Sequence, residues 1–540
     1  MNVAAAMIRR LEDHGVDRCF CIPGESYLEV LNALRDSKID TVVARQEGGA
    51  AIMAEADAKL TGKVGICFVT RGPGATNASA GVHIAQQDST PLILFVGQVA
   101  STMIGRDAFQ EVDFDAFFGG MTNAVLHLRE DTDPFRLVDR AVTAAQSDRP
   151  GSVVVVLPED LQHRGVVIEP PPLIETASEP VDTTSLVDLL TDARRPIVLA
   201  GGGGWRAEDV VALERFSDIW DVPVSVTFRR QHLFNHDHPG YAGDCGIGIN
   251  PSLRARIEGA DLVIVMGSRF SEVPSQSFTL LEKEQSGQKL VHIHASEVGR
   301  FPQADVIIRS HPSAVLPELV RLNPEIDRGT WTLEAHQDYL RWSGPPSNPG
   351  NVQMGVLIKH LRATLADEAV VCNGAGNYAT WVHRFFRFRN HGSQLAPTSG
   401  SMGYGLPAAI AAKMRYPDRE VVCLAGDGCL QMTIQEFGTA VQYGANVVVI
   451  VIDNGMYGTI RMHQERNFPG RVHATDIVNP DFKALAEAYG GFGIRVDSTE
   501  EFAGALQLAL NAAKPALIHV RLDPEAITPD RRLSELSRVS

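Results

Sequence analysis

The sequence has no long hydrophobic run, no excess of positive charge and no paired-cysteine motif. Its longest purely apolar runs, such as residues 447–452, have the length of a β-strand and are too short to cross a membrane. Lysine and arginine number 49 against 65 acidic residues, a formal net charge of −16, which disfavours a nucleic-acid scaffold. The seven cysteines form no CxxC pair and most stand in apolar segments, so we expect reduced thiols in a cytosolic protein.

The 540 residues carry enough apolar material for several domains. Hydrophobic residues make up 44% and charged residues 21%, which is typical of globular proteins, and this length predicts three or four domains. Two proline-rich stretches, residues 166–182 and 326–350, are predicted linkers. They leave three segments, 1–165, 183–325 and 351–530, followed by a polar tail that we expect to be loosely held.

Short runs of β-branched residues alternate with helical patterns through all three segments. Predicted helices include residues 1–15, 48–61 and 433–444. The predicted strands are residues 41–44, 65–70, 91–96, 152–157, 196–200, 222–226, 262–266, 290–294, 369–373, 421–425, 447–452 and 516–520. This alternation predicts an α/β fold with doubly wound parallel sheets, in which ligands bind beyond the carboxyl ends of the strands.

The sharpest local pattern is Gly426-Asp427-Gly428 at the end of one predicted strand, with Asp453-Asn454 at the end of the next. The 24 residues between Gly428 and Asp453 fit one helix and one parallel strand, which places Asp427 and Asn454 at the same sheet edge. Two hard oxygen ligands suit Mg²⁺ when phosphate oxygens complete its coordination. Gly428 would let the backbone approach a phosphate, and a helix predicted to begin near Cys429 would direct its amides at it. A plain strand-to-helix turn with a capping aspartate is the alternative.

This spacing resembles that of the thiamine-diphosphate enzymes, most closely the acetolactate synthase large-subunit branch. The resemblance covers nearly the whole chain. It implies a pyrimidine-binding domain at 1–165, a central domain at 183–325 and a diphosphate-binding domain at 351–530.

The same resemblance assigns the metal ligands. It implies that Asp427, Asn454 and the backbone carbonyl of Met456 hold Mg²⁺. The family motif ends in two asparagines, and Asp453 replaces the first of them.

The segment Arg45-Gln46-Glu47-Gly48-Gly49 resembles the family's catalytic-glutamate motif. The resemblance implies that Glu47 bonds the aminopyrimidine ring of the cofactor and so helps to activate its reactive carbon. Taken alone, Glu47 is equally explained as an acid stabilised at a helix N-terminus. In the family the first segment of one subunit faces the third segment of another, which implies a homodimer or homotetramer with a shared active site.

Three further motifs carry the resemblance. Residues 400–409 are similar to the family's GxMGxGLPAA, in which Met402 would bend the cofactor and the Gly400 carbonyl would accept from its amino group. Residues 72–77 match GPGATN, and residues 374–378 stand where the family has a diphosphate loop. The cofactor-binding residues that the resemblance implies are Pro23, Pro73, Asn77, Gly376, Asn377, Tyr378, Gly400, Met402, Gly426, Gly428, Cys429 and Tyr457.

The residues that select the reaction depart from each familiar pattern. Phe109 and Gln110 match the acetolactate synthase branch, whereas the usual lysine of that branch is Asn123 and its usual tryptophan is His463. The candidate catalytic residues are Glu47, Gln110, Glu25, His83 and His463. Each histidine is also explained as a hydrogen-bonded structural residue. Arg461 could pair with a substrate carboxylate, or be a solvated helix charge.

The middle segment contains a glycine-rich turn, LAGGGGWRA at residues 199–207, that formally matches a dinucleotide fingerprint. The acid expected at the end of the next strand is absent, because that strand runs into Thr227-Phe228-Arg229-Arg230. We therefore do not expect FAD, although the family admits it. The same absence argues against an NAD dehydrogenase.

Together these patterns predict an enzyme that requires thiamine diphosphate and Mg²⁺. It would decarboxylate a 2-oxo acid and ligate the remaining enamine to an aldehyde or ketone acceptor. One alternative is a decarboxylase that releases the aldehyde, with His83, His463 or Glu25 as proton donor. Another is a non-catalytic cofactor-binding paralogue, against which the retention of Glu47 with Asp427 argues. We expect no nucleic-acid or membrane partner and a cytoplasmic location.

Overall fold

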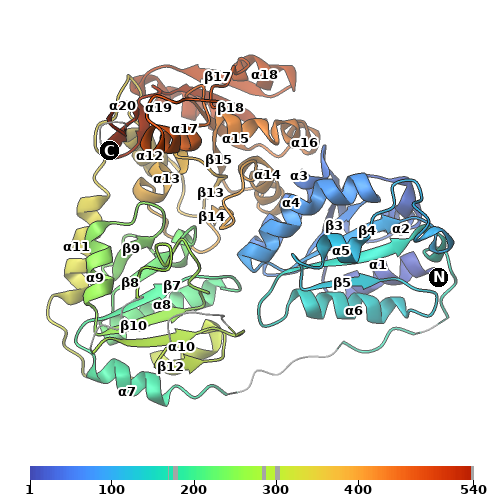
Figure 1. Cartoon of the computed structure of the whole chain (residues 1–540), viewed down its shortest axis with the longest axis horizontal. Coiled ribbons are helices and arrows are strands. Elements are labelled where there is room, and N and C mark those ends of the chain that lie inside the picture. The colour runs from blue at the N-terminus through green and yellow to red at the C-terminus, as the bar shows by residue number, and fades with distance from the viewer. Residues whose placement is uncertain (168, 174–179, 282–286, 298–303, 537–540) are drawn as a thin grey trace. The chain divides into compact units, whose positions relative to one another are not determined.

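The computed structural model describes residues 1–167, 169–173, 180–281, 287–297 and 304–536. The chain forms two compact units, which are described separately below. Unit 1 comprises Met1–Ala177, Pro397–Pro417 and Met432–Ala445, and unit 2 comprises Ser178–Ala396, Asp418–Gln431 and Asn446–Ser540. Among the described residues, unit 1 contains one six-stranded parallel sheet and unit 2 contains two (Figure 1). The predicted α/β fold of doubly wound parallel sheets is confirmed.

The sheet of unit 1 has the strand order β2-β1-β3-β4-β6-β5. Its strands are β1 (Arg18–Cys21), β2 (Asp40–Val43), β3 (Gly65–Val69), β4 (Leu92–Gln98), β5 (Ala124–His127) and β6 (Ser152–Pro158). The helices of unit 1 are α1 (Val3–Asp13), α2 (Leu28–Arg35), α3 (Glu47–Thr61), α4 (Gly72–Asp88), α5 (Phe114–Phe118), α6 (Pro134–Ala145), α14 (Gly405–Arg415) and α16 (Phe437–Tyr443).

Helices cover both faces of this sheet. The apolar sides of α1, α2 and α6 share one core with the strands, while α3 and α4 pack on the opposite face (Figure 1). Helices α3 and α4 are built largely from alanine and glycine, which lets them approach closely. A Cβ atom on Gly81 of α4 would lie only 2.4 Å from Cβ of Ala51 on α3. Helix α14 packs against α3 as well.

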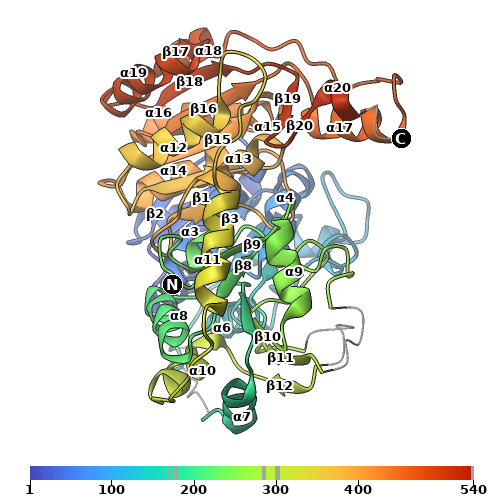
Figure 2. The same cartoon turned by 90° about the vertical axis from the view of Figure 1, so that its left-hand side faces the viewer.

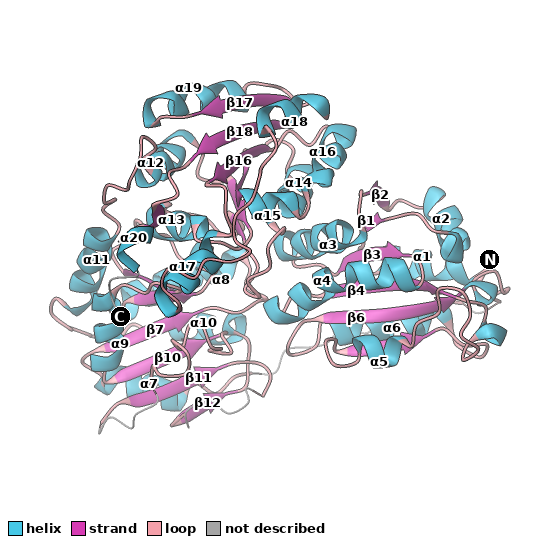
Figure 3. Cartoon of the chain, turned by 45° about the horizontal axis from the view of Figure 1, so that its top comes forward, coloured by secondary structure: helices cyan, strands magenta, loops and turns pink. Residues whose placement is uncertain are grey.

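The first sheet of unit 2 has the order β12-β11-β10-β7-β8-β9. Its strands are β7 (Pro196–Ala200), β8 (Val224–Thr227), β9 (Tyr241–Cys245), β10 (Leu262–Met266), β11 (Lys289–Ile293) and β12 (Val306–Ile308). Figure 3 shows β7, β10, β11 and β12 side by side. Its helices are α7 (Thr184–Asp192), α8 (Ala207–Trp220), α9 (Pro251–Gly259), α10 (Pro312–Val320) and α11 (Trp331–Trp342). Helices α7, α8 and α10 share one core with the sheet, and α9 and α11 lie together on the other face (Figure 2).

The second sheet of unit 2 has the order β14-β13-β15-β16-β18-β17. Its strands are β13 (Val370–Asn373), β14 (Gln394–Leu395), β15 (Val421–Gly426), β16 (Val448–Asp453), β17 (Phe492–Val496) and β18 (Ala516–Arg521). The associated helices are α12 (Met354–Thr364), α13 (Tyr378–Phe385), α15 (Asp427–Gln431), α17 (Gly458–Asn467), α18 (Phe482–Ala488) and α19 (Thr499–Leu510). A small hairpin of β19 (Ala526–Thr528) and β20 (Arg531–Arg532) and helix α20 (Leu533–Leu536) complete the unit.

Three local expectations need correction. The tail is packed through residue 536, because Leu533 and Leu536 of α20 bury themselves against Ile527 and Met456. The second predicted linker contains α11, whose Ala335 and Tyr339 are buried although its flanks are rich in proline. The helix predicted at 433–444 is split into a 3₁₀ turn and α16.

Two expectations from the composition agree with the structure. All seven cysteines are buried and none forms a disulfide, as the absence of a CxxC motif indicated. Among the described residues, no helix combines the length and the apolarity that crossing a bilayer requires.

Candidate active site

In unit 1, Glu47 is the first residue of α3 and is reached directly from the end of β2. Gln46 caps the helix, its side-chain oxygen accepting from the backbone N–H of Gly49 at 3.1 Å. Glu436, fully buried, accepts from the backbone N–H of Arg45 through both carboxylate oxygens, each at 3.1 Å. The polypeptide on either side of Glu47 is thereby fixed, which sets the direction of its carboxylate.

The GPGATN motif forms the first turns of α4 and meets Glu47. Asn77 donates from Nδ2 to Oε2 of Glu47 at 3.0 Å. A Cβ atom on Gly74 would lie 2.9 Å from the Thr70 side chain and 3.5 Å from Oε1 of Glu47, so glycine keeps this approach open. The Gln110 carbonyl accepts from Gly72 N–H at 3.0 Å, with Gln110 held at φ 65°. The structure therefore gathers Glu47, Asn77 and the Gln110 backbone.

Glu25 lies in a 3₁₀ turn just after Pro23, at the carboxyl edge of the same sheet. Its side chain is 69% exposed and lies 3.3 Å from the guanidinium of Arg71, which also binds Glu159 at 2.9 Å. Arg71 immediately precedes the GPGATN motif. Glu25 is thus placed at the strand ends as expected, but as one member of an ion-pair cluster.

The segment that carries Gly400 and Met402 is tied to helices α3 and α4. Tyr404 donates from its hydroxyl to Oε2 of Glu55 at 2.7 Å, and Thr398 N–H donates to Asp88 at 2.7 Å. Both carboxyl groups are buried, and Lys59 Nζ contacts both of them. Burial raises the pKa of Glu55, against the opposing effect of Lys59. These contacts fix both ends of the segment around Met402.

In unit 2, the two predicted metal ligands lie at the carboxyl ends of the adjacent strands β15 and β16. Asp427 accepts from Gly428 N–H through Oδ1 and from Gly455 N–H through Oδ2, each at 2.9 Å. Asn454 Oδ1 accepts from Met456 N–H at 3.3 Å. Asp427 and Asn454 therefore both accept a hydrogen bond from the loop that contains Gly455 and Met456. The Met456 carbonyl in this loop is the third predicted ligand.

A hydrogen-bond network lies behind this loop. Asn479 donates from Nδ2 to Asp427 at 2.7 Å and to Asp453 at 2.8 Å. Asp453 also accepts from His519 at 2.7 Å and from Arg521 at 2.9 Å. Burial acts to raise the pKa of Asp453, but the hydrogen bonds from His519 and Asn479 outweigh it and hold that pKa at about 2. Asp453 is thus a carboxylate that the protein stabilises in its charged form.

The predicted diphosphate-binding positions line the same strand ends. The Tyr378 ring fills the space beside Gly426, where a Cβ would come within 3.0 Å of it, and its hydroxyl accepts from Gly374 N–H at 3.0 Å. Tyr457 occupies the corresponding space beside Gly428. Cys429 is buried with its sulfur 3.4 Å from the Tyr378 hydroxyl.

Gly376 and Asn377 join α13 to the loop that follows the metal ligands. Gly376 has φ 144°, a conformation that favours glycine, just before α13 begins. Asn377 accepts from the hydroxyl of Thr459 in α17 at 2.9 Å.

The two candidate histidines are exposed and stand apart from these clusters. His83 lies on α4, six residues beyond Asn77, and six residues turn a helix by roughly 240°, so the two side chains leave different faces. His463 is exposed on α17, a helix without buried residues. Arg461 on the same helix pairs with Glu465 at 3.0 Å and with Asp476 at 3.7 Å. Its charge is thus already matched by carboxylates.

The glycine-rich turn after β7 is filled by the protein itself. The carbonyls of Gly201, Gly202 and Gly203 accept from Trp205 at 2.8 Å, Arg230 at 2.7 Å and His311 at 3.3 Å, respectively. A Cβ on Gly202 would lie 1.9 Å from the Gly267 carbonyl oxygen. Close packing thus explains these glycines, and the Arg230 that replaced the expected acid is part of that packing.

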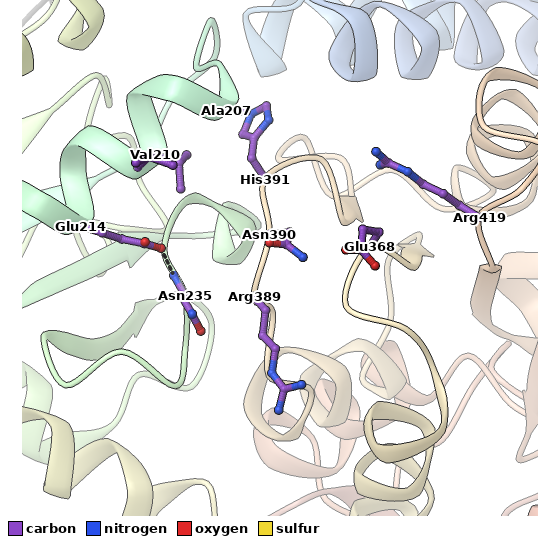
Figure 4. Close-up of a pocket in the computed structure, with 10 residues that line it drawn as sticks. Ala207, Val210, Glu214, Asn235, Glu368, Arg389, Asn390, His391 and Arg419 are labelled. Carbon is purple, nitrogen blue, oxygen red and sulfur yellow. Dashed lines mark hydrogen bonds between the residues drawn. The ribbon is translucent and has the colours of Figure 1, made fainter.

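A separate cavity of about 330 Å³ in unit 2 contains none of the predicted site residues (Figure 4). It lies between α8 and residues 389–391, and its lining mixes acidic with basic side chains. Glu214 and Asn235 are linked there by a 3.2 Å hydrogen bond from the Asn235 backbone. The cavity offers no reactive cluster.

The residues at the strand ends suit Mg²⁺ and a diphosphate. The donors are a carboxylate, an amide oxygen and a carbonyl, which is the hard-oxygen set that Mg²⁺ takes when phosphate oxygens complete an octahedron. Among the described residues, no group of three or more His, Cys, Asp or Glu side chains is arranged to hold a metal ion by itself.

Comparison with family models decides the assignment. Residues 1–117 match the N-terminal thiamine pyrophosphate (TPP) binding domain of thiamine pyrophosphate enzymes, residues 183–319 match their central domain, and residues 374–520 match their C-terminal TPP binding domain. The chain belongs to the thiamine pyrophosphate enzyme family. Within it, the chain is acetolactate synthase-like.

The similar curated proteins cover nearly the full chain. The acetolactate synthase large subunit of Parasynechococcus marenigrum is 32% identical, over 96% of this chain and 87% of that protein. The acetolactate synthase isozyme 2 large subunit of Escherichia coli is 30% identical, over 97% and 96%. The acetolactate synthase large subunit of Lactococcus lactis is 31% identical, over 95% and 91%.

Sequence reasoning missed three residues that organise the site: Asn479, Glu436 and Arg71. Asn479 stands in the loop between α17 and α18, directly after Ile477 and Val478, and carries no local motif. Glu436 and Arg71 gave a weak signal, an acid inside an apolar helical pattern and a cation directly before a glycine-rich turn.

Proposed function

We propose that this protein is a carboligase that depends on thiamine diphosphate and Mg²⁺. It takes a 2-oxo acid, releases the carboxyl group as CO₂ and joins the remaining acyl carbon to an aldehyde or ketone acceptor. The acetolactate synthase-like character of the chain, together with Phe109 and Gln110, supports ligation over simple release of an aldehyde.

The observation that carries the proposal is the fixed position of Glu47. Its carboxylate is held through one oxygen by Asn77, and the backbone before it is held by buried Glu436. A protein that only bound the cofactor would have no need to constrain this carboxylate from two directions. The metal-ligand pair Asp427 and Asn454 is retained as well.

Different residues of the chain would have different roles in this reaction. Bound thiamine diphosphate would supply a nucleophilic carbon that adds to the carbonyl of the acid, and a cationic ring that takes up the electron pair left by the departing CO₂. Asp427, Asn454 and the Met456 carbonyl would hold Mg²⁺, which neutralises the diphosphate. Oε1 of Glu47, the oxygen that does not bond Asn77, would exchange a proton with the ring nitrogen of the aminopyrimidine. Gly400 and Met402 would orient that ring from the segment fixed by Tyr404.

We assign residues 1–165, 183–325 and 351–530 as the pyrimidine-binding, central and diphosphate-binding domains. We further propose a homo-oligomer, dimer or tetramer, in which the first and third domains of different subunits meet. A cytoplasmic location is supported by the seven buried cysteines, none of which forms a disulfide.

We propose that the central domain holds no flavin. The carbonyls of its glycine-rich turn accept from Trp205, Arg230 and His311, so packing within the protein accounts for these glycines, and no acid directly follows β8 to bind a ribose. Purified protein loaded with FAD and then desalted should show no absorbance near the flavin band. Stoichiometric retained flavin would contradict this.

The first test of the proposed function is CO₂ release from a panel of 2-oxo acids. Release should require both Mg²⁺ and thiamine diphosphate, and it should vanish in Glu47→Gln. Tight binding of the cofactor without CO₂ release from any acid would favour the non-catalytic alternative. Absence of cofactor binding would contradict the proposal altogether.

A further inference from the structure

Asn479 lies between α17 and α18, outside the motifs described above, and is half-buried. Both N–H donors and the oxygen of its side-chain amide make hydrogen bonds. The Nδ2 group donates to Oδ2 of Asp427 at 2.7 Å and to Oδ1 of Asp453 at 2.8 Å, while its Oδ1 accepts from Gln431 at 2.7 Å. A reversed amide would turn its oxygen toward two carboxylates and lose the Gln431 bond, so this orientation is the one that the hydrogen bonds permit.

The bonds of Asn479 determine which oxygen of Asp427 remains open. A carboxylate offers roughly four lone-pair positions. On Asp427, Oδ2 takes two donors, Asn479 Nδ2 and Gly455 N–H, whereas Oδ1 takes one, Gly428 N–H. The remaining position therefore lies on Oδ1, and Oδ2 is turned into the protein. Without Asn479, each oxygen of Asp427 would keep a single backbone donor, and the orientation of the carboxylate would be less firmly fixed.

Asp453 anchors the other side of this arrangement. Its carboxylate is almost fully buried, at 1% exposure, and it accepts from His519 at 2.7 Å and Arg521 at 2.9 Å as well as from Asn479. Gly455 N–H reaches both carboxylates, Asp427 at 2.9 Å and Asp453 at 3.1 Å. The amide of Asn479 and the N–H of Gly455 are thus shared donors that hold the two carboxylates side by side.

We propose that Asn479 is a positioning residue for the metal centre, one that orients the Asp427 carboxylate by bridging it to Asp453. The inference rests on the proposed function, since it concerns the Mg²⁺ that Asp427 would bind. It goes beyond the metal-ligand motif, because Asn479 stands 25 residues past Asn454.

Two substitutions of Asn479 separate the effect of losing its hydrogen bonds from the effect of adding a negative charge. Asn479→Ala removes both donors without adding charge. Asn479→Asp keeps the shape and places a third carboxylate beside Asp427 and Asp453. Removing a residue that orients a metal ligand typically weakens metal affinity about 10–100-fold. We expect Asn479→Ala to raise the dissociation constant for the metal by about tenfold or more, and Asn479→Asp to raise it further.

Asn348 provides a matched control. Its buried amide is also completely used, donating to the carbonyls of Pro349 at 2.9 Å and Val352 at 2.8 Å and accepting from Met354 N–H at 2.9 Å. Asn348→Asp therefore loses two amide N–H donors, as the Asn479 variants do, and it lies in the same unit. The bonds that it loses connect residues within 348–354. It should lower the melting temperature and leave metal affinity within about twofold of the wild type.

The experiment is a Mn²⁺ titration of the full-length protein at saturating thiamine diphosphate, followed by electron paramagnetic resonance of the free ion, with melting temperatures measured without metal. The proposal is supported if both Asn479 variants weaken Mn²⁺ binding and Asn348→Asp does not. It is overturned if either Asn479 variant binds Mn²⁺ as the wild type does, or if the control weakens binding equally. Failure of the wild type itself to bind Mn²⁺ would instead overturn the proposed function, and this inference with it.

Discussion

Asn77 donates a hydrogen bond of 3.0 Å to Glu47, although the two residues belong to different helices and are 30 positions apart. Glu47 begins α3 and Asn77 lies in the first turns of α4, and the small residues of both helices allow the approach. The pairing leaves Oε1 of Glu47 free of this bond. This geometry links two sequence motifs, and under the proposed function they form one proton-handling element.

The first prediction concerns Glu47. Glu47→Gln should lower kcat by roughly 10²–10⁴-fold, because a positioned acid–base group contributes about that much to a proton-transfer step. The amide should change the melting temperature little, since Glu47 is only half-buried at the surface of unit 1. Steady-state kinetics and thermal unfolding measure the two quantities.

A matched control exists in the same unit. Asn2 donates to Glu29 at 2.6 Å, an equivalent Asn–Glu pair outside the motifs. Glu29→Gln should leave kcat unchanged. Equal rates for Glu47→Gln and the wild type would refute the role assigned to Glu47.

The second prediction concerns the metal. Asp427→Ala should weaken binding of thiamine diphosphate in the presence of Mg²⁺ by at least about tenfold, because the bridge between protein and diphosphate is lost. Removing Mg²⁺ with EDTA should have a comparable effect on the wild type and little further effect on the variant. Calorimetric titration with and without Mg²⁺ distinguishes these cases. A variant that retained wild-type, Mg²⁺-dependent affinity would exclude Asp427 as a ligand.

The third prediction concerns the anchoring of the Met402 segment. Tyr404→Phe leaves the buried Glu55 carboxyl without one donor and should cost about 1–3 kcal/mol of unfolding free energy. Tyr416 donates to the Leu60 carbonyl at 3.2 Å, a neutral acceptor elsewhere on α3, so Tyr416→Phe should cost about 0.5–1.5 kcal/mol. Urea unfolding of both variants gives the comparison. A smaller loss for Tyr404→Phe than for Tyr416→Phe would show that Glu55 does not depend on this hydroxyl.

The fourth prediction concerns pH. Burial lowers the pKa of His236 to about 3, below the usual value near 6.5. Between these values the unfolded chain binds a proton that the folded protein does not, so stability rises with pH and is lost as pH falls. His236→Gln should reduce the slope of stability against pH by about 1.4 kcal/mol per pH unit between pH 4 and 6.

Asp244 should change the pH dependence of stability in the direction opposite to His236. Burial raises its pKa to about 7, so between about pH 4 and 7 the folded protein binds the extra proton and stability falls as pH rises. In Asp244→Asn, the unfolding free energy should therefore rise more steeply with pH over this range than it does in the wild type. Chemical unfolding at several pH values measures both variants, and slopes that moved in the same direction would contradict the assignment.

Sequence reasoning found most of the central strands and missed most of the outer ones. The exceptions are the inner strand β1, which was missed, and the edge strand β2, which was found as residues 41–44. Strands β7 and β10 were located to the residue, because both lie in the middle of their sheet and are continuously apolar. Of the missed strands, β5, β9, β12, β14 and β17 all lie at sheet edges. Most edge strands are covered less completely, so their side chains need not be uniformly apolar, and β17 reads Phe-Gly-Ile-Arg-Val.

Some residues of the candidate site could also be found from the sequence, and others could not. Asp427 and Asn454 could be placed from strand spacing, since adjacent parallel strands end at one edge. Asn479 could not be found, because its bonds to Asp427 and Asp453 arise from the path of a polar loop that no periodicity describes. The packed tail was missed for a related reason, since Leu533 and Leu536 are isolated apolar residues in a polar segment.

The most direct test of the account is product identity. The purified protein, with Mg²⁺ and thiamine diphosphate, should be incubated with each 2-oxo acid in the presence and absence of an aldehyde or ketone acceptor, and products identified by mass spectrometry. The account predicts a hydroxy ketone or acetohydroxy acid whose mass equals the acid plus the acceptor minus CO₂. Release of free aldehyde alone, whatever acceptor is supplied, would contradict it.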